Sequence, residues 1–221
     1  MYFIVKKIVY LQKEPIYISI NQRVVRPTKQ KTMAKVYEFL ATGFEEVEAL
    51  LPVDILRRAG VEIKTVSVTG DTWVTSSHGV TIQADLKFED IRHFDDVDML
   101  LLPGGMPGAT NLNEHAGVRE ALLAHHAKGK RIGAICAGPM VLGSLGLLKG
   151  RKATCYPGFE KYMEGADYTA ELFTVDGNII TGEGPAATFP YAFEILKGFV
   201  GEAETKELQK QMRFTHLMET K

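Results

Sequence analysis

The sequence predicts a doubly wound α/β sandwich with a mostly parallel sheet. Short apolar runs at 36–40, 61–68, 97–102 and 130–135 are typical of strands buried on both faces. Helical patterns follow most of these runs, and strands that alternate with helices favour a parallel sheet covered on both sides. In such sheets ligands bind beyond the carboxyl ends of the strands, so we searched there for functional side chains.

Composition excludes several classes of protein. The 221 residues are 45% hydrophobic and 24% charged, with a net charge of −1, as in an ordinary globular domain. No basic excess indicates nucleic-acid binding, and no apolar run approaches the length that spans a membrane. Two cysteines, Cys136 and Cys155, form neither a disulfide framework nor a zinc cluster, so we expect a cytoplasmic protein without a metal.

The first 32 residues differ from the rest of the chain. They contain seven Lys or Arg and one Glu, which leaves 19 basic and 26 acidic residues downstream. Lys13 and Glu14 interrupt their apolar runs, so this stretch is a poor signal peptide. We interpret 1–32 as a basic extension outside the fold and 33–221 as a single domain. The alternative is a β-prone arm that docks on a neighbouring molecule.

The first helix, expected at 45–59, begins with acidic residues that complement its dipole, namely Glu45, Glu46 and Glu48. Its predicted buried face consists of Val47, Leu50, Leu51, Ile55 and Ala59. Pro52 lies within this pattern and predicts a kink or a restart. Later expected elements are a β ribbon at 73–82, a helix at 118–127, a strand at 153–156, a hairpin at 173–180, and helices at 185–200 and 202–212.

Cys136 lies between the strand at 130–135 and the helix that follows, as in a nucleophile elbow. We expect the bend to lift its sulfur into solvent, where free N–H groups of the helix favour the thiolate. The alternative is a buried cysteine that acts as a small apolar residue.

Other groups are expected at the same sheet edge. The N–H groups of Gly105 and Ala137 are natural donors for an oxyanion, and Glu48 lies one turn into the first helix. A protonated Glu48 would hydrogen-bond the thiolate. The alternative is that Glu48, like Glu45 and Glu46, caps a helix in water, and spacing alone does not decide between them.

Four stretches, in this order, resemble the ThiJ/PfpI superfamily: TGFEEVEALLPVDILRRAG, DVDMLLLPGGMPGATNL, GAICAGPMVLG and ITGEGPAATFPYAFEIL. The resemblance covers about residues 33–205 and is greatest to the subgroup of the parkinsonism-associated deglycase and its bacterial relatives. It implies a flavodoxin-like fold of the class I glutamine amidotransferase type, usually in a homodimer. It also implies that Cys136 is a nucleophile hydrogen-bonded to a protonated Glu48, and that the N–H groups of Gly105 and Ala137 donate to an oxyanion. It implies no cofactor.

The resemblance implies overlapping activities. One is conversion of methylglyoxal to lactate, or removal of early glyoxal adducts, through a hemithioacetal on Cys136 with Glu48 moving the proton. The alternative is a redox-sensing chaperone in which Cys136 is oxidised rather than turned over. A hydrolase of the protease-like branch is the weakest reading, because Ala137 stands where that branch has histidine. The expected partner is a small aldehyde or glycated substrate, with no nucleic acid or membrane.

The chain departs from the subgroup around the expected pocket, whose candidates are Gly104, His78, Tyr156 and Glu183. Tyr156 stands where some members have a histidine, and the sequence leaves open whether it replaces that group. His78 and Glu183 stand where animal relatives have basic residues, which would weaken binding of anionic ligands. Elsewhere we expect His125 and His126 to be solvated on a helix surface and Cys155 to be half-buried.

Overall fold

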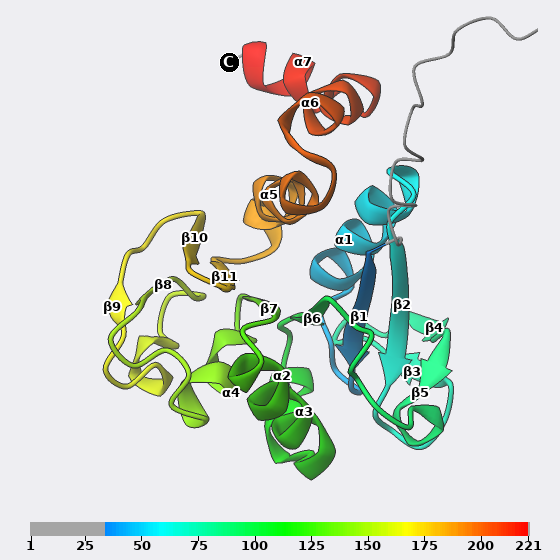
Figure 1. Ribbon diagram of the computed structural model, residues 1–221, viewed down its shortest axis with the longest axis vertical. Helices are drawn as coiled ribbons and strands as arrows, with labels where there is room; N and C mark the ends of the chain where they lie inside the picture. The colour runs from blue at the N-terminus through cyan, green and yellow to red at the C-terminus, as the bar shows by residue number, and fades with distance from the viewer. Residues whose placement is uncertain (1–33, 221) are drawn as a thin grey trace, which may run out of the picture. The chain divides into compact units, whose positions relative to one another are not determined.

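The central element of the structure is a seven-stranded sheet with the strand order β10-β11-β7-β6-β1-β2-β5 (Figure 1). The computed structural model describes residues 34–220. The strands are β1 Lys35–Leu40, β2 Glu62–Ser67, β5 Leu86–Lys87, β6 Met99–Leu102, β7 Arg131–Ile135, β10 Phe173–Asp176 and β11 Ile179–Gly182. Strand β10 pairs antiparallel with β11, and every other neighbouring pair in this sheet is parallel. The prediction of a mostly parallel, doubly wound sheet is therefore confirmed.

Helices cover both faces of this sheet. They are α1 Glu46–Arg58, α2 Gly108–Glu114, α3 Ala116–Ala127, α4 Pro139–Ser144, α5 Thr188–Val200, α6 Glu202–Gln211 and α7 Phe214–Glu219. Along β1, Val36 packs into a core with α1, α5 and α6, whereas Tyr37 packs into a second core with α2, α3 and α4. This alternation follows from the two-residue period of a strand, and it produces a layer of helices on each side.

Several short elements lie outside the central sheet. They are the antiparallel ribbon β3 Trp73–Thr75 and β4 Thr81–Gln83, the parallel pair β8 Lys152–Ala153 and β9 Asp167–Tyr168, and the 3₁₀ turns η1 Phe88–Asp90, η2 Glu160–Tyr162 and η3 Pro185–Ala187. The ribbon expected at 73–82 is confirmed, and it is separate from the central sheet. The strand expected at 153–156 is wrong beyond Ala153, because β8 ends there.

The predicted buried face of α1 is partly wrong. Val47 and Leu50 are exposed, whereas Ala49, Val53 and Leu56 are buried. The buried residues follow the i, i+4, i+7 spacing of one helix face, and that face also turns Glu48 inward. Pro52 neither ends nor restarts the helix, which is one continuous element.

Two predictions of exposure are also wrong. His125 is buried, because it continues the face of α3 that Val118 and Leu122 turn toward the sheet. Burial, aided by the charge of Lys130, lowers the pKa of His125 to about 4, so its imidazole is neutral at physiological pH. Cys155 is completely buried rather than half-buried.

The described residues belong to one compact unit. The interpretation of residues 1–32 as a basic extension lies outside the described part of the chain. Within residues 34–220 no helix combines the length and the apolar character needed to cross a membrane.

Glu38 is an unexpected acid in the interior. It lies on β1, is 1% exposed, and its Oε2 has no hydrogen-bond partner among the described residues. Burial raises the pKa of this carboxyl well above its ordinary value. Because the folded state then holds a proton that the unfolded state has lost, the free energy of unfolding falls as pH rises above the ordinary pKa of glutamate.

We therefore predict that Glu38→Met stabilises the protein. The change removes a buried unsatisfied group, and we expect it to raise the free energy of unfolding by about 1–3 kcal/mol at neutral pH. The gain is expected to shrink toward about pH 4, where the unfolded carboxyl is also protonated. Urea denaturation at pH values between about 4 and 7 measures this gain in the free energy of unfolding. An equal gain at every pH would show that Glu38 does not titrate on unfolding.

Candidate active site

Cys136 occupies a left-handed bend between β7 and α4, with φ of 62°. A non-glycine residue in this conformation costs about 1–2 kcal/mol, so its surroundings must hold it there. Its N–H donates to Gly182 O at 2.9 Å, and its carbonyl accepts from Tyr156 N at 2.9 Å. These bonds join the bend to the end of β11 and to the following loop. Contrary to expectation, the side chain is not lifted into solvent: Cys136 is only 9% exposed.

Glu48 approaches this cysteine from α1. Its side chain is completely buried, and Oε2 accepts a hydrogen bond from Gly104 N at 2.9 Å. The carboxyl also interacts with the Cys136 thiol, although Oε1 has no hydrogen bond of regular geometry. The structure therefore brings Glu48 and Cys136 together and removes Glu48 from water.

Gly104 makes this approach possible. A Cβ atom at this position would lie 2.6 Å from Cys136 Cβ and 2.6 Å from Glu48 Oε2, closer than real Cβ atoms come. The N–H of Gly104 holds the Glu48 carboxyl beside the sulfur.

Burial controls the charges of this pair. It raises the pKa of Glu48 to about 7, and burial together with the charge of an ionised Glu48 raises the pKa of the Cys136 thiol. The N–H groups of Gly105 and Ala137 face the sulfur and act in the opposite direction.

Cys136 lines a hollow of about 630 Å³, whereas Glu48 contacts Cys136 but is not part of the wall. Of the predicted site residues, Cys136, Gly105, Ala137, His78 and Tyr156 line this hollow. Gly104 lies beneath it, and Glu183 is not part of its wall. Tyr156 is 46% exposed, and its backbone N–H supports the Cys136 bend.

Several further residues line the hollow that the sequence did not indicate, namely Ser77, Met106, Phe159 and Pro185, together with Glu45. Glu45 was expected to cap a helix in water. It does cap α1, accepting from Glu48 N at 2.7 Å, but it is only 9% exposed. Pro185 was detectable, because it follows the end of β11 at the sheet edge where ligands bind.

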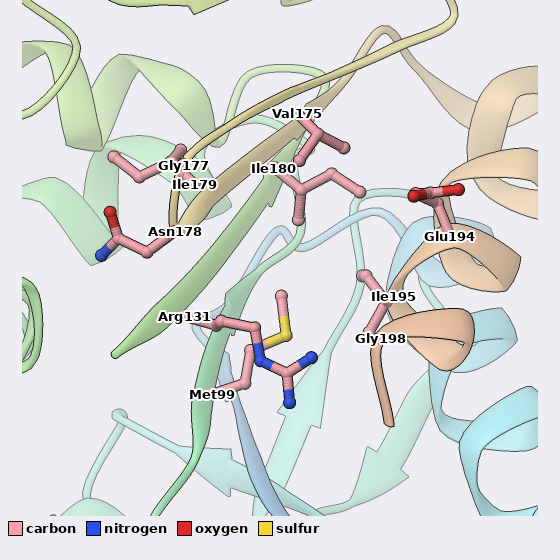
Figure 2. Close-up of a pocket in the computed structure, with 10 residues that line it drawn as sticks. All are labelled: Met99, Arg131, Val175, Gly177, Asn178, Ile179, Ile180, Glu194, Ile195 and Gly198. Carbon is pink, nitrogen blue, oxygen red and sulfur yellow. The ribbon is translucent and has the colours of Figure 1, made fainter. Parts of the chain in front are cut away.

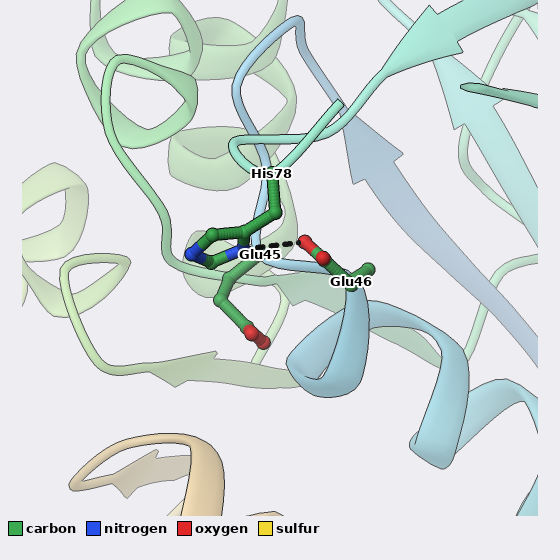
Figure 3. A group of neighbouring side chains, drawn as sticks. All are labelled: Glu45, Glu46 and His78. Atoms are coloured by element: carbon green, nitrogen blue, oxygen red, sulfur yellow. Dashed lines mark hydrogen bonds and ion pairs between the residues drawn. The ribbon is translucent and has the colours of Figure 1, made fainter. Parts of the chain in front are cut away.

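One group at the rim has the donor atoms for a metal ion. Ligand atoms of Glu45, Glu46 and His78 all lie within 4.8 Å of one another (Figure 3). Their present contacts account for them without an ion, because Glu45 caps α1 and His78 Nδ1 lies 3.0 Å from Glu46 Oε2. The bond to Glu46 raises the pKa of His78, which favours the imidazolium and opposes metal binding.

Sequence comparison identifies relatives over most of the chain. Residues 34–198 match the model of the DJ-1/PfpI family. The Parkinson disease protein 7 homolog of Danio rerio is 38% identical over 165 residues, which cover 73% of this chain and 87% of the relative. A deglycase of Pyrococcus abyssi is 36% identical over 160 residues, which cover 71% and 94%.

Solved structures give the same result. A cysteine-to-alanine mutant of a DJ-1 superfamily protein from Salmonella typhimurium superposes with a TM-score of 0.78 at 34% identity, covering 81% of this chain and 98% of that one. The oxidised DJ-1 of Toxoplasma gondii gives 0.77 at 34% identity, covering 81% and 97%. The family match and the shared fold show that this chain belongs to the DJ-1/PfpI family.

Proposed function

We propose that this protein is a cysteine-dependent, cofactor-free enzyme of the glyoxalase or deglycase type, acting on methylglyoxal or its early adducts. The observation that carries the proposal is a buried carboxyl, Glu48, against a cysteine held in a strained bend beneath an open hollow. A relative from Pyrococcus abyssi is named a deglycase, which agrees with this reaction class.

The first step is addition to the aldehyde. The Cys136 thiolate attacks the aldehyde carbon, and the N–H groups of Gly105 and Ala137 stabilise the developing oxyanion. The Glu48 carboxyl donates its proton to this oxygen, so the products are a hemithioacetal and a Glu48 carboxylate.

The second step is an internal oxidation and reduction. The Glu48 carboxylate removes the proton from the former aldehyde carbon, and the electron pair forms a double bond to the neighbouring carbon, whose carbonyl oxygen becomes an enediolate oxygen. The hydroxyl proton of the former aldehyde moves to that oxygen, and Glu48 returns its proton to the neighbouring carbon, which gives a lactate thioester on Cys136. Water then cleaves the C–S bond and releases the thiol, so methylglyoxal and one water are converted to lactate and one proton.

Which group of the Cys136–Glu48 pair loses its proton first can be measured. In our proposal the thiol loses its proton before Glu48 does, so the ultraviolet absorbance of the thiolate should rise below the ordinary pKa of cysteine, about 8.5. Glu48→Gln should keep this midpoint within about one pH unit, because its amide still donates to the sulfur. Glu48→Leu should raise it, because the buried thiolate loses that donor. A thiolate that forms only above about pH 9 in the unmodified protein, and at lower pH in Glu48→Gln, would instead place the first ionisation on Glu48.

Lactate formation from methylglyoxal tests the activity itself. We expect steady turnover by the unmodified protein, none by Cys136→Ser, and a loss of about 100-fold or more in Glu48→Gln, which cannot carry the proton. Cys155→Ala is the matched control, because Cys155 is buried outside the hollow and its loss should leave turnover unchanged. If neither the unmodified protein nor Cys136→Ser forms lactate, methylglyoxal is excluded as the substrate.

A second candidate function is that of a redox-sensing chaperone, and it is favoured by one observation: the similar DJ-1 of Toxoplasma gondii was solved oxidised. Two equivalents of peroxide would convert the Cys136 thiolate to a sulfinate, releasing two waters, and a protonated Glu48 would donate to a sulfinate oxygen. The hydrolase alternative has little support, because His78 is the histidine at this hollow and its Nδ1 is bonded to Glu46.

Peroxide treatment followed by intact-mass measurement tests the sensor. We expect the mass of two oxygens in the unmodified protein and in Cys155→Ala, and no such gain in Cys136→Ser. A mass gain that continues beyond two oxygens, or oxidation at Cys155, would contradict the sensor function.

A further inference from the structure

A second hollow, of about 420 Å³, lies between the sheet and α5 (Figure 2). Its walls include the apolar side chains of Met99 on β6, Val175 on β10, Ile180 on β11 and Ile195 on α5. Arg131, the first residue of β7, extends its guanidinium into this space toward Gly198 of α5 (Figure 2). The hollow thus combines an apolar lining with one cationic group.

The Arg131 guanidinium lies against an aromatic ring and forms no ion pair with any of residues 34–220. Its central carbon lies 3.6 Å from the centre of the Phe199 ring on α5. Its Nη1 faces Gly198 of the same helix, and none of its five N–H groups donates a hydrogen bond within the described residues. Partial burial lowers the pKa of this guanidinium, and the charge of Asp98 acts in the opposite direction.

Two carboxylates lie near Arg131, and neither forms a direct ion pair with it. Glu194, at the wall of the hollow, forms an ion pair with Lys197. Asp98 precedes β6 and is exposed; its Oδ2 accepts a hydrogen bond from the backbone N–H of Lys35 at 2.8 Å, and its charge acts on the guanidinium without a direct contact. Among the described residues, Arg131 is therefore the charged group of this hollow without a direct ion pair.

Gly198 provides the room for the guanidinium. A Cβ atom at this position would lie 2.5 Å from Arg131 Nη1. Glycine is unfavourable inside a helix, and here its missing side chain allows α5 to accommodate the arginine.

This hollow is separate from the Cys136 site. Arg131 begins β7 and Cys136 follows its last residue, so a whole strand of about 16 Å lies between them. None of the residues that line the first hollow lines the second.

We propose that this second hollow binds a hydrophobic monocarboxylate, with the carboxylate on the Arg131 guanidinium and the apolar body against Met99, Val175, Ile180 and Ile195. The planar fork of arginine matches the two oxygens of a carboxylate. A single negative charge suits the site better than two, because the Glu194 carboxylate lies in the same wall. The apolar lining requires a ligand whose remaining surface is hydrocarbon.

Calorimetric titration of the full chain with octanoate tests the proposal. We expect saturable binding of one octanoate, much weaker binding of 1-octanol, which has the same body without the charge, and no binding of inorganic phosphate at the same concentrations. Arg131→Gln should weaken octanoate binding by about tenfold or more. Cys136→Ser should bind octanoate as the unmodified protein does, because it leaves this hollow intact.

A second variant separates binding from folding. Gly198→Ala keeps the charge and favours the helix, but its methyl group displaces the guanidinium, so octanoate binding should fall while thermal stability is maintained. Unchanged octanoate affinity in both Arg131→Gln and Gly198→Ala would overturn the proposal. Equal affinity for 1-octanol would overturn the role of the charge, and phosphate binding that displaces octanoate would overturn the role of the apolar walls.

Discussion

The conformation of Cys136 is the constraint on which the candidate active site depends. A left-handed cysteine is unfavourable in isolation, and two backbone hydrogen bonds, to Gly182 and from Tyr156, hold it in place. Those partners come from β11 and from the loop after β8, so the bend exists only once the sheet is assembled. The reactive geometry is therefore a product of the complete fold rather than of the local sequence.

The burial of Glu48 adds a second free-energy cost at the same site. A carboxyl buried on α1 opposes folding when ionised, and the raised pKa of about 7 expresses that penalty. One hydrogen bond from Gly104 and the thiol of Cys136 are its compensation. A proton shared between two such groups is easily moved, which is what a proton transfer between adjacent carbons of a substrate requires. Glu38 has no comparable partner, so its burial brings the same penalty without an evident role in this site.

The fold was largely predictable from the sequence because its main signals are local. Apolar runs and helical spacing located β1, β2, β6 and β7, and strand ends located Cys136 and Gly105. Contacts distant in sequence were not predictable. Which stripe of α1 faces the sheet depends on α5, so Val47 was placed inside although it is exposed.

The exposure of individual site residues could not be predicted from the sequence either. The bend at Cys136 indicated a residue presented to solvent, but Cys136 is only 9% exposed, and the walls of its hollow include Met106 and Phe159 from other loops. Spacing could not decide between Glu48 as a cap in water and Glu48 as a buried acid. The deciding contact joins it to Gly104, 56 residues away.

The two ends of β7 show how one strand can supply two different chemistries. At its carboxyl end the chain bends at Cys136 to expose backbone N–H groups to a sulfur. At its amino end Arg131 faces α5 across a glycine. The five-residue strand between them is buried except at Arg131, so its position is fixed by both cores of the sandwich. A rigid strand keeps the two sites apart, and side chains at either end can change without altering the packing that holds the other.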